Sequence, residues 1–315
     1  MMAVHHFTDR LIERLPMVRG RLIENADLAK VTWFRVGGPA EVLFRPADKD
    51  DLTTFLQELP REVAVTMLGV GSNILIRDGG IPGVSIRLGD GFSKINTQDH
   101  LIKAGAGASN LKIANAARDH GLTGFEFLSG IPGALGGSIR MNAGAFGGEI
   151  GAVVETVGGL TRSGGEVQFT RQDMTFSYRH TNVDANVIFT DVTLRGQPDD
   201  RDAIMGRMAE IQVERELSQP IKQATSGSTF VNPEGGTAWE LIDQAGCRGL
   251  KRGKAQVSEK HCNFLINQGG ASAADLEALG EDVRRRVRNQ TGIILEWEIK
   301  RIGVYAGAGP QEFES

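Results

Sequence analysis

Glycine is the residue that most constrains what this chain can fold into. The 315 residues include 41 glycines, which gather at 69–91, 105–107, 121–151 and 158–165 and do not repeat at a fixed period. Because glycine has no Cβ, it adopts positive φ at tight turns and lets backbone approach a ligand closely. The glycines of 129–151 are mixed with apolar residues, whereas a flexible linker is usually more polar. The pattern predicts many β turns and a backbone cradle for a ligand.

Composition narrows the class of protein further. A chain of this length, 40% hydrophobic and 23% charged, is typical of a globular protein with two or three domains. The net charge is −4 and no long basic run occurs, so a nucleic-acid partner is not expected. Cys247 and Cys262 form no CxxC pair, which favours a reduced, cytoplasmic protein. We expect no signal peptide at the start, no membrane span, and a monomer.

Hydrophobic spacing predicts an irregular mixture of helices and strands. Leu52, Phe55, Leu56 and Leu59 are spaced as on one helix face, between acids at 48–51 and Pro60. Ser109 is expected to cap a helix, and Ser272 with Asp275 resembles a capping box. Strands are expected at 41–46, 63–68, 74–77, 84–88, 100–104, 153–160, 166–170, 186–194, 263–267 and 293–302, and further helices at 111–120, 204–211, 237–244 and after 272. This irregular order favours an α+β fold over one doubly wound sheet.

Two glycine-rich loops are candidates for a nucleotide site, and the sequence supports one of them better than the other. Gly105-Ala-Gly-Ala-Ser-Asn110 lies between a strand and a helix like a Rossmann fingerprint, but Asn110 replaces its third glycine. Glu126 also fails to end a second clean parallel strand, so a Rossmann site is disfavoured. Gly69-Val-Gly-Ser-Asn73 offers consecutive N–H groups at a strand end, which fits a pyrophosphate nest or a plain β turn equally well.

A series of motifs along the chain carries a family resemblance. They are GVGSN at 69–73, EFLSGIPGALGGSIRMNAGAFGGE at 126–149, TWFRVGGPA at 32–40, SYR at 177–179, GSTF at 227–230 with NP at 232–233, VSEKH at 257–261 and LEWEI at 295–299. In kind and order they resemble the UDP-N-acetylenolpyruvoylglucosamine reductase (UDP-N-acetylmuramate dehydrogenase) family, within the vanillyl-alcohol-oxidase/PCMH-type FAD-binding superfamily. The short segment between Arg179 and Gly227 resembles that of the family's shorter subtype.

The resemblance implies an architecture. It is a two-subdomain PCMH-type FAD-binding fold followed by a C-terminal α+β substrate-binding domain. We place the first FAD-binding subdomain at 1–92, the second at 93–198, the substrate-binding domain at 199–302 and a C-terminal tail at 303–315.

The resemblance also implies an activity. NADPH as co-substrate would reduce FAD, which would reduce the enolpyruvyl group of UDP-N-acetylglucosamine enolpyruvate to give UDP-N-acetylmuramate, a peptidoglycan precursor. The FAD is expected to be non-covalent, because no histidine lies within 69–73 or 129–151. The alternatives are another FAD-dependent sugar or alcohol oxidase of the superfamily and a flavin-binding protein without catalysis. No histidine spacing suggests a catalytic metal.

For the flavin, the resemblance assigns backbone-rich contacts from three segments of the chain. They are Arg35, Gly37, Gly69, Gly71, Ser72, Asn73, Ser129, Gly130, Ile131, Pro132, Gly133, Gly136, Gly137, Asn142, Ala143 and Gly144.

The resemblance assigns catalysis to Arg179, Ser228 and Glu298. Negative charge builds on the substrate carboxylate during reduction, and a guanidinium can bind both of its oxygens, as implied for Arg179. Ser228 matches the family's proton donor, although alone it would be read as a turn residue. A strand period of two puts Glu296 and Glu298 on one face and does not choose between them; the resemblance selects Glu298.

Substrate contacts are implied for Tyr178, Asn232 and His261, although an ordinary, partly buried histidine explains His261 equally well. Two positions depart from the family pattern: Val231 stands where lysine is usual and His180 where an acid is usual. Valine cannot bind a phosphate as that lysine would, so a different lysine would have to do so. The candidates are Lys222, Lys251 and Lys254.

Overall fold

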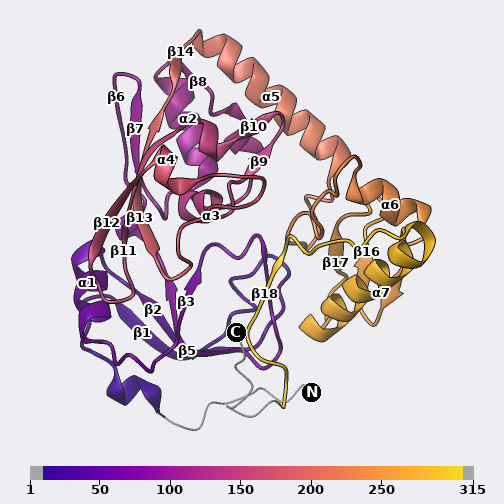
Figure 1. Cartoon of the computed structure of the whole chain (residues 1–315), viewed down its shortest axis with the longest axis horizontal. Helices are drawn as coiled ribbons and strands as arrows, with labels where there is room; N and C mark the ends of the chain where they lie inside the picture. The colour runs from indigo at the N-terminus through magenta and orange to yellow at the C-terminus, as the bar shows by residue number, and fades with distance from the viewer. Residues whose placement is uncertain (1–9, 308–315) are drawn as a thin grey trace.

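The structure, a computed structural model, describes residues 10–307, and its mixture of helices and sheets confirms the expected α+β class (Figure 1). The expectation of no signal peptide concerns the start of the chain, of which residues 1–9 lie outside this range, as does the predicted tail from 308 onward. Figure 1 shows three parts: an indigo N-terminal part, a magenta middle part and an orange-to-yellow C-terminal part.

The N-terminal part is a four-stranded sheet covered by one helix. Its strand order is β1-β2-β5-β3, with β1 antiparallel to β2 and with β2 and β3 parallel to β5. The elements are η1 (Leu11–Arg14), β1 (Arg21–Ala26), β2 (Ala40–Arg45), α1 (Lys49–Glu58), β3 (Val65–Leu68), β4 (Ile74–Ile76), β5 (Ile81–Arg87) and η2 (Asp90–Phe92). Helix α1 begins as predicted, because the Asp48 side chain accepts from the Asp51 N–H. Its Phe55 ring packs 4.2 Å from that of Phe44, centroid to centroid.

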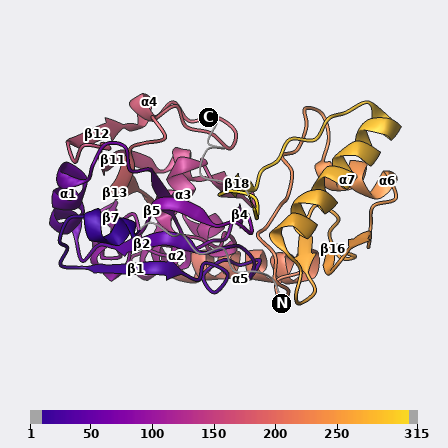
Figure 2. The ribbon, with the colours of Figure 1, turned by 90° about the horizontal axis from the view of Figure 1, so that it is seen from below.

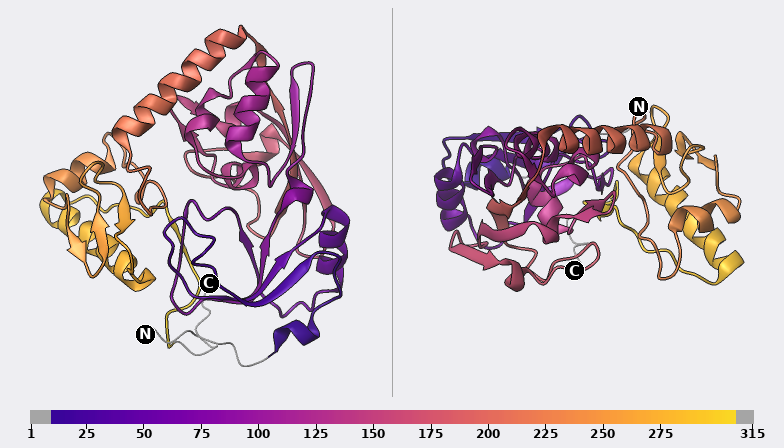
Figure 3. Two further views of the ribbon diagram at one scale, coloured as in Figure 1. Left: turned by 180° about the vertical axis from the view of Figure 1, so that it is seen from behind. Right: turned by 90° about the horizontal axis from the view of Figure 1, so that it is seen from above.

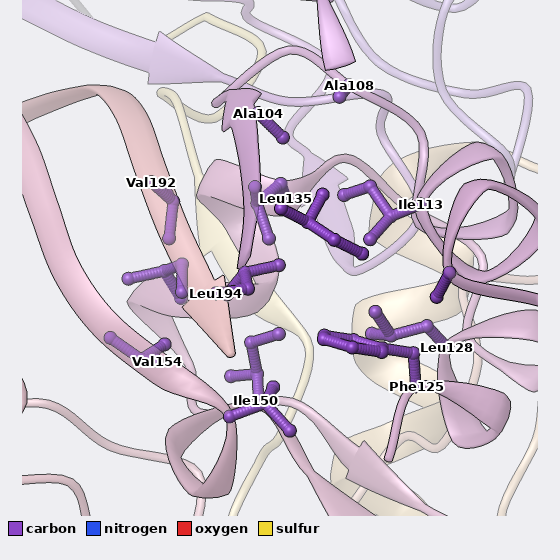
Figure 4. Packing of buried hydrophobic residues seen from close by; sticks show 14 of the residues in the cluster. Ala104, Ala108, Ile113, Phe125, Leu128, Leu135, Ile150, Val154, Val192 and Leu194 are labelled. Carbon is purple, nitrogen blue, oxygen red and sulfur yellow. The ribbon is translucent and has the colours of Figure 1, made fainter. Parts of the chain in front are cut away.

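The middle part is a five-stranded antiparallel sheet, in the order β12-β11-β13-β7-β6, with helices packed against it. Its elements are β6 (Ile95–Gln98), β7 (Leu101–Gly105), α2 (Asn110–Asp119), β8 (Leu122–Thr123), η3 (Glu126–Gly130), α3 (Leu135–Arg140), β9 (Gly144–Ala145), β10 (Gly148–Glu149), η4 (Ile150–Ala152), β11 (Val154–Leu160), β12 (Glu166–Thr170), α4 (Arg171–Met174), β13 (Ile188–Arg195) and β14 (Gln197–Pro198). Leu194, Leu135 and Leu128 meet in its core, part of which Figure 4 shows.

One local prediction for the middle part needs correction. Ser109 stands at the N-cap of α2, but its side chain makes no capping hydrogen bond. The glycine-rich stretch predicted to form a cradle contains the short helix α3, whose Leu135 and Ile139 are buried. The disfavoured Rossmann motif serves packing, since a Cβ on Gly105 would lie 2.0 Å from the Phe92 carbonyl oxygen.

Helix α5 (Arg201–Ser218) connects the middle part to the C-terminal part, along the upper edge in Figure 1. Its buried Ile204 and Met208 belong to the core of the middle part. Arg207 adds hydrogen bonds of 3.0 and 2.8 Å to the Glu126 carboxylate. The views from behind and above in Figure 3 show the helix crossing to the C-terminal part.

The C-terminal part packs two helices on a small sheet. Its elements are α6 (Ala238–Gln244), β15 (Lys251–Arg252), β16 (Ala255–Val257), β17 (Leu265–Asn267), α7 (Ala273–Thr291) and β18 (Lys300–Ile302). The capping box is confirmed: Ser272 and Asp275 exchange side-chain-to-backbone bonds at the start of α7. The strand predicted at 293–302 is wrong for most of its length, since only 300–302 form a strand, in parallel with β4, while Trp297 makes an isolated antiparallel bridge to Phe230.

Contacts from α7 and β18 hold the C-terminal part against the N-terminal part, to its side in Figure 2. The Asp78 carboxylate accepts from the Ala273 and Ala274 N–H groups at 2.9 Å each. Arg77 makes two 3.0 Å hydrogen bonds to the Glu277 carboxylate. These contacts therefore fix the position of the C-terminal part relative to the N-terminal part. The predicted domain boundaries stay predictions.

Candidate active site

A cavity of about 440 Å³ lies where the three parts meet, a size typical of small-molecule sites. Its lining is drawn from loops far apart in the sequence: Trp33, Met67, 69–74, 130–134, Gly137, Ser138, Arg140, Met141, 143–145, Arg179, Arg215, Gln219, Pro220, Ile221, Gln223, 225–228, Phe264, Glu298 and Lys300. The glycine loop 69–73 and the glycine-rich stretch from which a ligand cradle was predicted both contribute to this lining, whereas the disfavoured loop 105–110 does not.

Glycines keep two walls of the cavity flat. A Cβ built on Gly69 or on Gly137 would meet no atom within 4 Å and would project into open space. Gly71 has a φ of 73° and Gly133 a φ of 150°, conformations that disfavour a side chain. The Ser72 hydroxyl donates to the Pro132 carbonyl at 3.1 Å and ties the two loops together. Because these glycines have no side chain, the space beside the wall stays free for a large, flat cofactor.

Most residues predicted to bind the cofactor reach this lining, but five do not. Those outside it are Arg35, Gly37, Ser129, Gly136 and Asn142. Gly37 is held without a side chain by packing, since its Cβ would lie 2.8 Å from the Ile76 Cβ. Gly136 similarly leaves room for Ala106, at 3.1 Å. Cofactor contacts by these five residues stay predictions.

Arg179 reaches the cavity from a tight turn over residues 177–180. Ser177 and His180 exchange two backbone hydrogen bonds of 3.1 Å, which close the turn. Arg179 has a φ of 55°, and a non-glycine residue in this region costs on the order of 1 kcal/mol or more. Its side chain is anchored: Nε donates to Glu298 Oε1 at 3.0 Å and Nη2 donates to the Gly144 carbonyl at 2.7 Å.

Glu298 is placed by backbone pairing rather than by strand alternation. Its N–H donates to the Thr229 carbonyl at 2.9 Å, and the Asn73 amide donates to its carbonyl at 3.2 Å. Glu298 lines the cavity, whereas Glu296 is exposed and outside the lining. Burial raises the pKa of Glu298, and the charge of Arg179 offsets only part of that rise.

Ser228 completes the group that the resemblance assigned to catalysis. It is half-buried and follows Gly227, whose φ is 81°. The next residue, Thr229, is fixed by its N–H, which donates to the Asn263 carbonyl at 2.7 Å. Arg179, Ser228 and Glu298, which are up to 119 residues apart in the sequence, therefore line one cavity.

The residues predicted to contact substrate do not line the cavity. Tyr178 is 53% exposed, and the Arg179 guanidinium lies 4.8 Å from its ring centroid. The Asn232 side chain accepts from the Ala238 N–H at 2.9 Å, at the start of α6. The His261 ring packs 4.8 Å from that of Phe264, and burial lowers its pKa. Their substrate contacts stay predictions.

Basic side chains that the sequence patterns did not point to also reach the cavity. Lys300 lines it, whereas Lys222, Lys251 and Lys254, the candidates to replace a lysine at Val231, are exposed and outside the lining. Arg215 comes from α5, and burial lowers its pKa. A signal existed for Arg215, because it continues the helical stripe of buried Ile204, buried Met208 and half-buried Ile211, where a charged residue is unusual.

Neither a metal site nor a membrane-spanning helix is found within residues 10–307. That range contains no group of three or more His, Cys, Asp or Glu side chains able to hold a metal ion. No helix within it combines the length and apolar character that crossing a bilayer requires.

Comparison with known proteins identifies the family. Residues 219–302 match the family described as UDP-N-acetylenolpyruvoylglucosamine reductase, C-terminal domain, and residues 40–169 match an FAD binding domain. The chain is 55% identical to a UDP-N-acetylenolpyruvoylglucosamine reductase of Methylorubrum extorquens over 97% of this chain and 99% of that one. It is also 55% identical to one of Paramagnetospirillum magneticum, over 93% and 95% of the two chains.

A solved structure agrees with the sequence comparisons. The crystal structure of the UDP-N-acetylenolpyruvylglucosamine reductase from Thermus caldophilus matches with a TM-score of 0.78 and 33% identity, over 90% of this chain and 99% of that chain. This match confirms the expected fold, an FAD-binding region followed by a C-terminal domain. The chain therefore belongs to the UDP-N-acetylenolpyruvoylglucosamine reductase family of enzymes.

Proposed function

We propose that this protein uses NADPH and non-covalent FAD to reduce UDP-N-acetylglucosamine enolpyruvate to UDP-N-acetylmuramate for peptidoglycan synthesis. The observation that carries the proposal is the meeting of Arg179, Ser228 and Glu298 in a glycine-walled cavity. Family membership supports the substrate and the matched FAD binding domain supports the cofactor. Work as a cytoplasmic monomer stays a prediction.

The cavity suits a flavin dinucleotide on one side and an anionic sugar nucleotide on the other. Gly69 and Gly137 leave open wall for a ring system, and the N–H groups of Gly71 to Asn73 suit its phosphates. When bound, FAD supplies the redox chemistry, by accepting a hydride from NADPH and delivering it to the enolpyruvyl methylene carbon. Arg215 and Lys300 add positive charge to the lining for the substrate's phosphates.

Arg179 is proposed to hold the substrate carboxylate. Its guanidinium forms a charge-assisted bond with Glu298, with side chains only 22% and 12% exposed. Electrostatic stabilisation is stronger in such a water-poor setting. As charge builds on the carboxylate during reduction, Arg179 stabilises it, and Glu298 keeps the guanidinium oriented.

Ser228 is proposed to give the proton that completes the reduction. Its hydroxyl would donate to the carbon beside the carboxylate, and the positive charge of Arg179 in the same cavity would lower the barrier by stabilising the serine alkoxide that the transfer leaves, which solvent then reprotonates. The fixed backbone at Thr229 keeps the Ser228 side chain at the cavity wall.

Separate measurement of the two half-reactions tests the proposal. In anaerobic stopped-flow, Ser228→Ala should leave the bleaching of flavin by NADPH intact, while re-oxidation by the enolpyruvyl sugar slows by about 10²–10⁴-fold. Ser163→Ala, on an exposed turn, is the control and should change neither rate. Equal slowing of both half-reactions in Ser228→Ala would remove Ser228 from the proton-donor role.

A further inference from the structure

Asn142 was predicted to bind the cofactor, yet its side chain faces the protein. It follows the end of α3, is 1% exposed and lies outside the cavity lining. Its Oδ1 accepts from the Gly151 N–H at 3.0 Å. Its Nδ2 donates to the Ser177 carbonyl at 2.9 Å and lies 3.3 Å from Glu149 Oε2. The polar atoms of the Asn142 amide are therefore occupied by this chain.

The Ser177 carbonyl is the first group of the turn that presents Arg179. It accepts from the His180 N–H, which closes the turn, and from Asn142, which ties the turn to the end of α3. Since Arg179 has a φ of 55° within this turn, its conformation persists only if the surroundings hold it. The bond from Asn142 is one such support.

The segment that carries Asn142 holds the turn at a second point. The Gly144 carbonyl accepts from Arg179 Nη2 at 2.7 Å, while Ala143 and Gly144 also line the cavity. Room for the Asn142 amide comes from Gly151, where a Cβ would lie 2.9 Å from Asn142 Oδ1. One short segment thus forms part of the cavity wall and fixes the arginine over it.

We propose that Asn142 is a positioning residue, which sets the place of the Arg179 guanidinium through the Ser177 carbonyl and does not itself contact the flavin. The inference rests on the proposed role of Arg179 in holding the substrate carboxylate. A misplacement of about 1 Å in a reacting group costs on the order of 10²-fold in rate. Loss of the Asn142 bond therefore affects the step that needs Arg179 and leaves the other step alone.

Asn142→Asp is the sharpest variant. It keeps the size of the side chain and an oxygen for the Gly151 N–H, but it places an acceptor against the Ser177 carbonyl. Flavin content and reduction by NADPH should match the wild type, while re-oxidation by the enolpyruvyl sugar slows by about 10²-fold. Asn142→Ser removes the same donor without adding charge and should act alike, so it decides the matter if the Asp variant fails to fold.

The control removes the other acceptor of the same amide. Glu149 is exposed, and Glu149→Ala keeps the Ser177 bond, so both half-reactions should run at the wild-type rate. If Glu149→Ala slows re-oxidation as much as Asn142→Asp does, the Ser177 bond is not the cause and the inference is overturned.

A double-mutant cycle separates positioning from a general structural effect. In an Arg179→Ala background Asn142→Asp should slow re-oxidation no further, because no guanidinium remains to be placed. Equal slowing by Asn142→Asp in both backgrounds, or weakened flavin binding, would overturn the inference. If Arg179→Ala alone leaves the rate of re-oxidation unchanged, both this inference and the proposed role of Arg179 fail. If Arg179→Ala slows re-oxidation and Asn142→Asp does not, only the inference about Asn142 fails.

Discussion

Gly137 offers a direct test of which wall the flavin occupies. It lines the cavity from within α3, its φ is not positive, and a Cβ there would meet no protein atom within 4 Å. Gly137→Ala should therefore leave the apoprotein intact and even stabilise it by roughly 0.5–1 kcal/mol, the gain of alanine over glycine in a helix.

Flavin binding should respond in the opposite direction. The added methyl group projects into the space proposed for the cofactor, and overpacking of this kind costs about 1–3 kcal/mol. At about 1.4 kcal/mol per tenfold, the dissociation constant for FAD should rise about 5- to 140-fold. Gly137→Leu, with a larger side chain at the same place, should abolish binding.

Titration of apoprotein with FAD, followed by flavin fluorescence, measures the effect, and urea unfolding of the apoprotein measures the stability. Gly206→Ala is the matched control: Gly206 is also helical and open within 4 Å, but it is an exposed residue of α5 outside the cavity lining. It should gain stability and bind FAD normally. A stable Gly137→Leu protein that binds FAD like the wild type would refute a flavin on this wall.

Two further outcomes follow from buried charges. Glu277→Ala should lower the free energy of unfolding, measured in urea, by about 3–5 kcal/mol, because it leaves Arg77 unpaired. The control Glu166→Ala removes an exposed ion pair with Lys49 and should lower it by about 0–1 kcal/mol. An equal loss of unfolding free energy in the two variants would contradict the reasoning. Burial raises the pKa of Glu298, so the folded protein keeps the carboxyl proton of Glu298 to a higher pH than the unfolded chain does. The protonated Glu298 therefore contributes its full stabilisation below the ordinary glutamate pKa. That stabilisation is lost as pH rises through the raised pKa. Unfolding measured over a pH series should show this loss in the wild type and not in Glu298→Gln, and an unfolding free energy that rises over this interval relative to the variant would show the sign to be wrong.

Local patterns in the sequence determined much of the architecture. Apolar spacing located α1, the chemistry of caps located the start of α7, and glycine clusters marked both loops of the cavity. These features depend on residues within a few positions of one another, so they can be read without knowing the tertiary structure. The ordered motifs identified the family for the same reason, since each is a short, contiguous string.

Tertiary packing decided what local patterns left open. Alternation could not separate Glu296 from Glu298; pairing with Thr229, about 70 residues away, turned Glu298 into the cavity. Asn142 belongs to a cofactor-like motif, yet the position of Ser177 turned its amide toward the turn that presents Arg179. Arg215 joined the cavity only because α5 crosses between two parts of the molecule. Sequence periodicity specifies which side chains share a face, but the partner that the face meets depends on how distant elements pack.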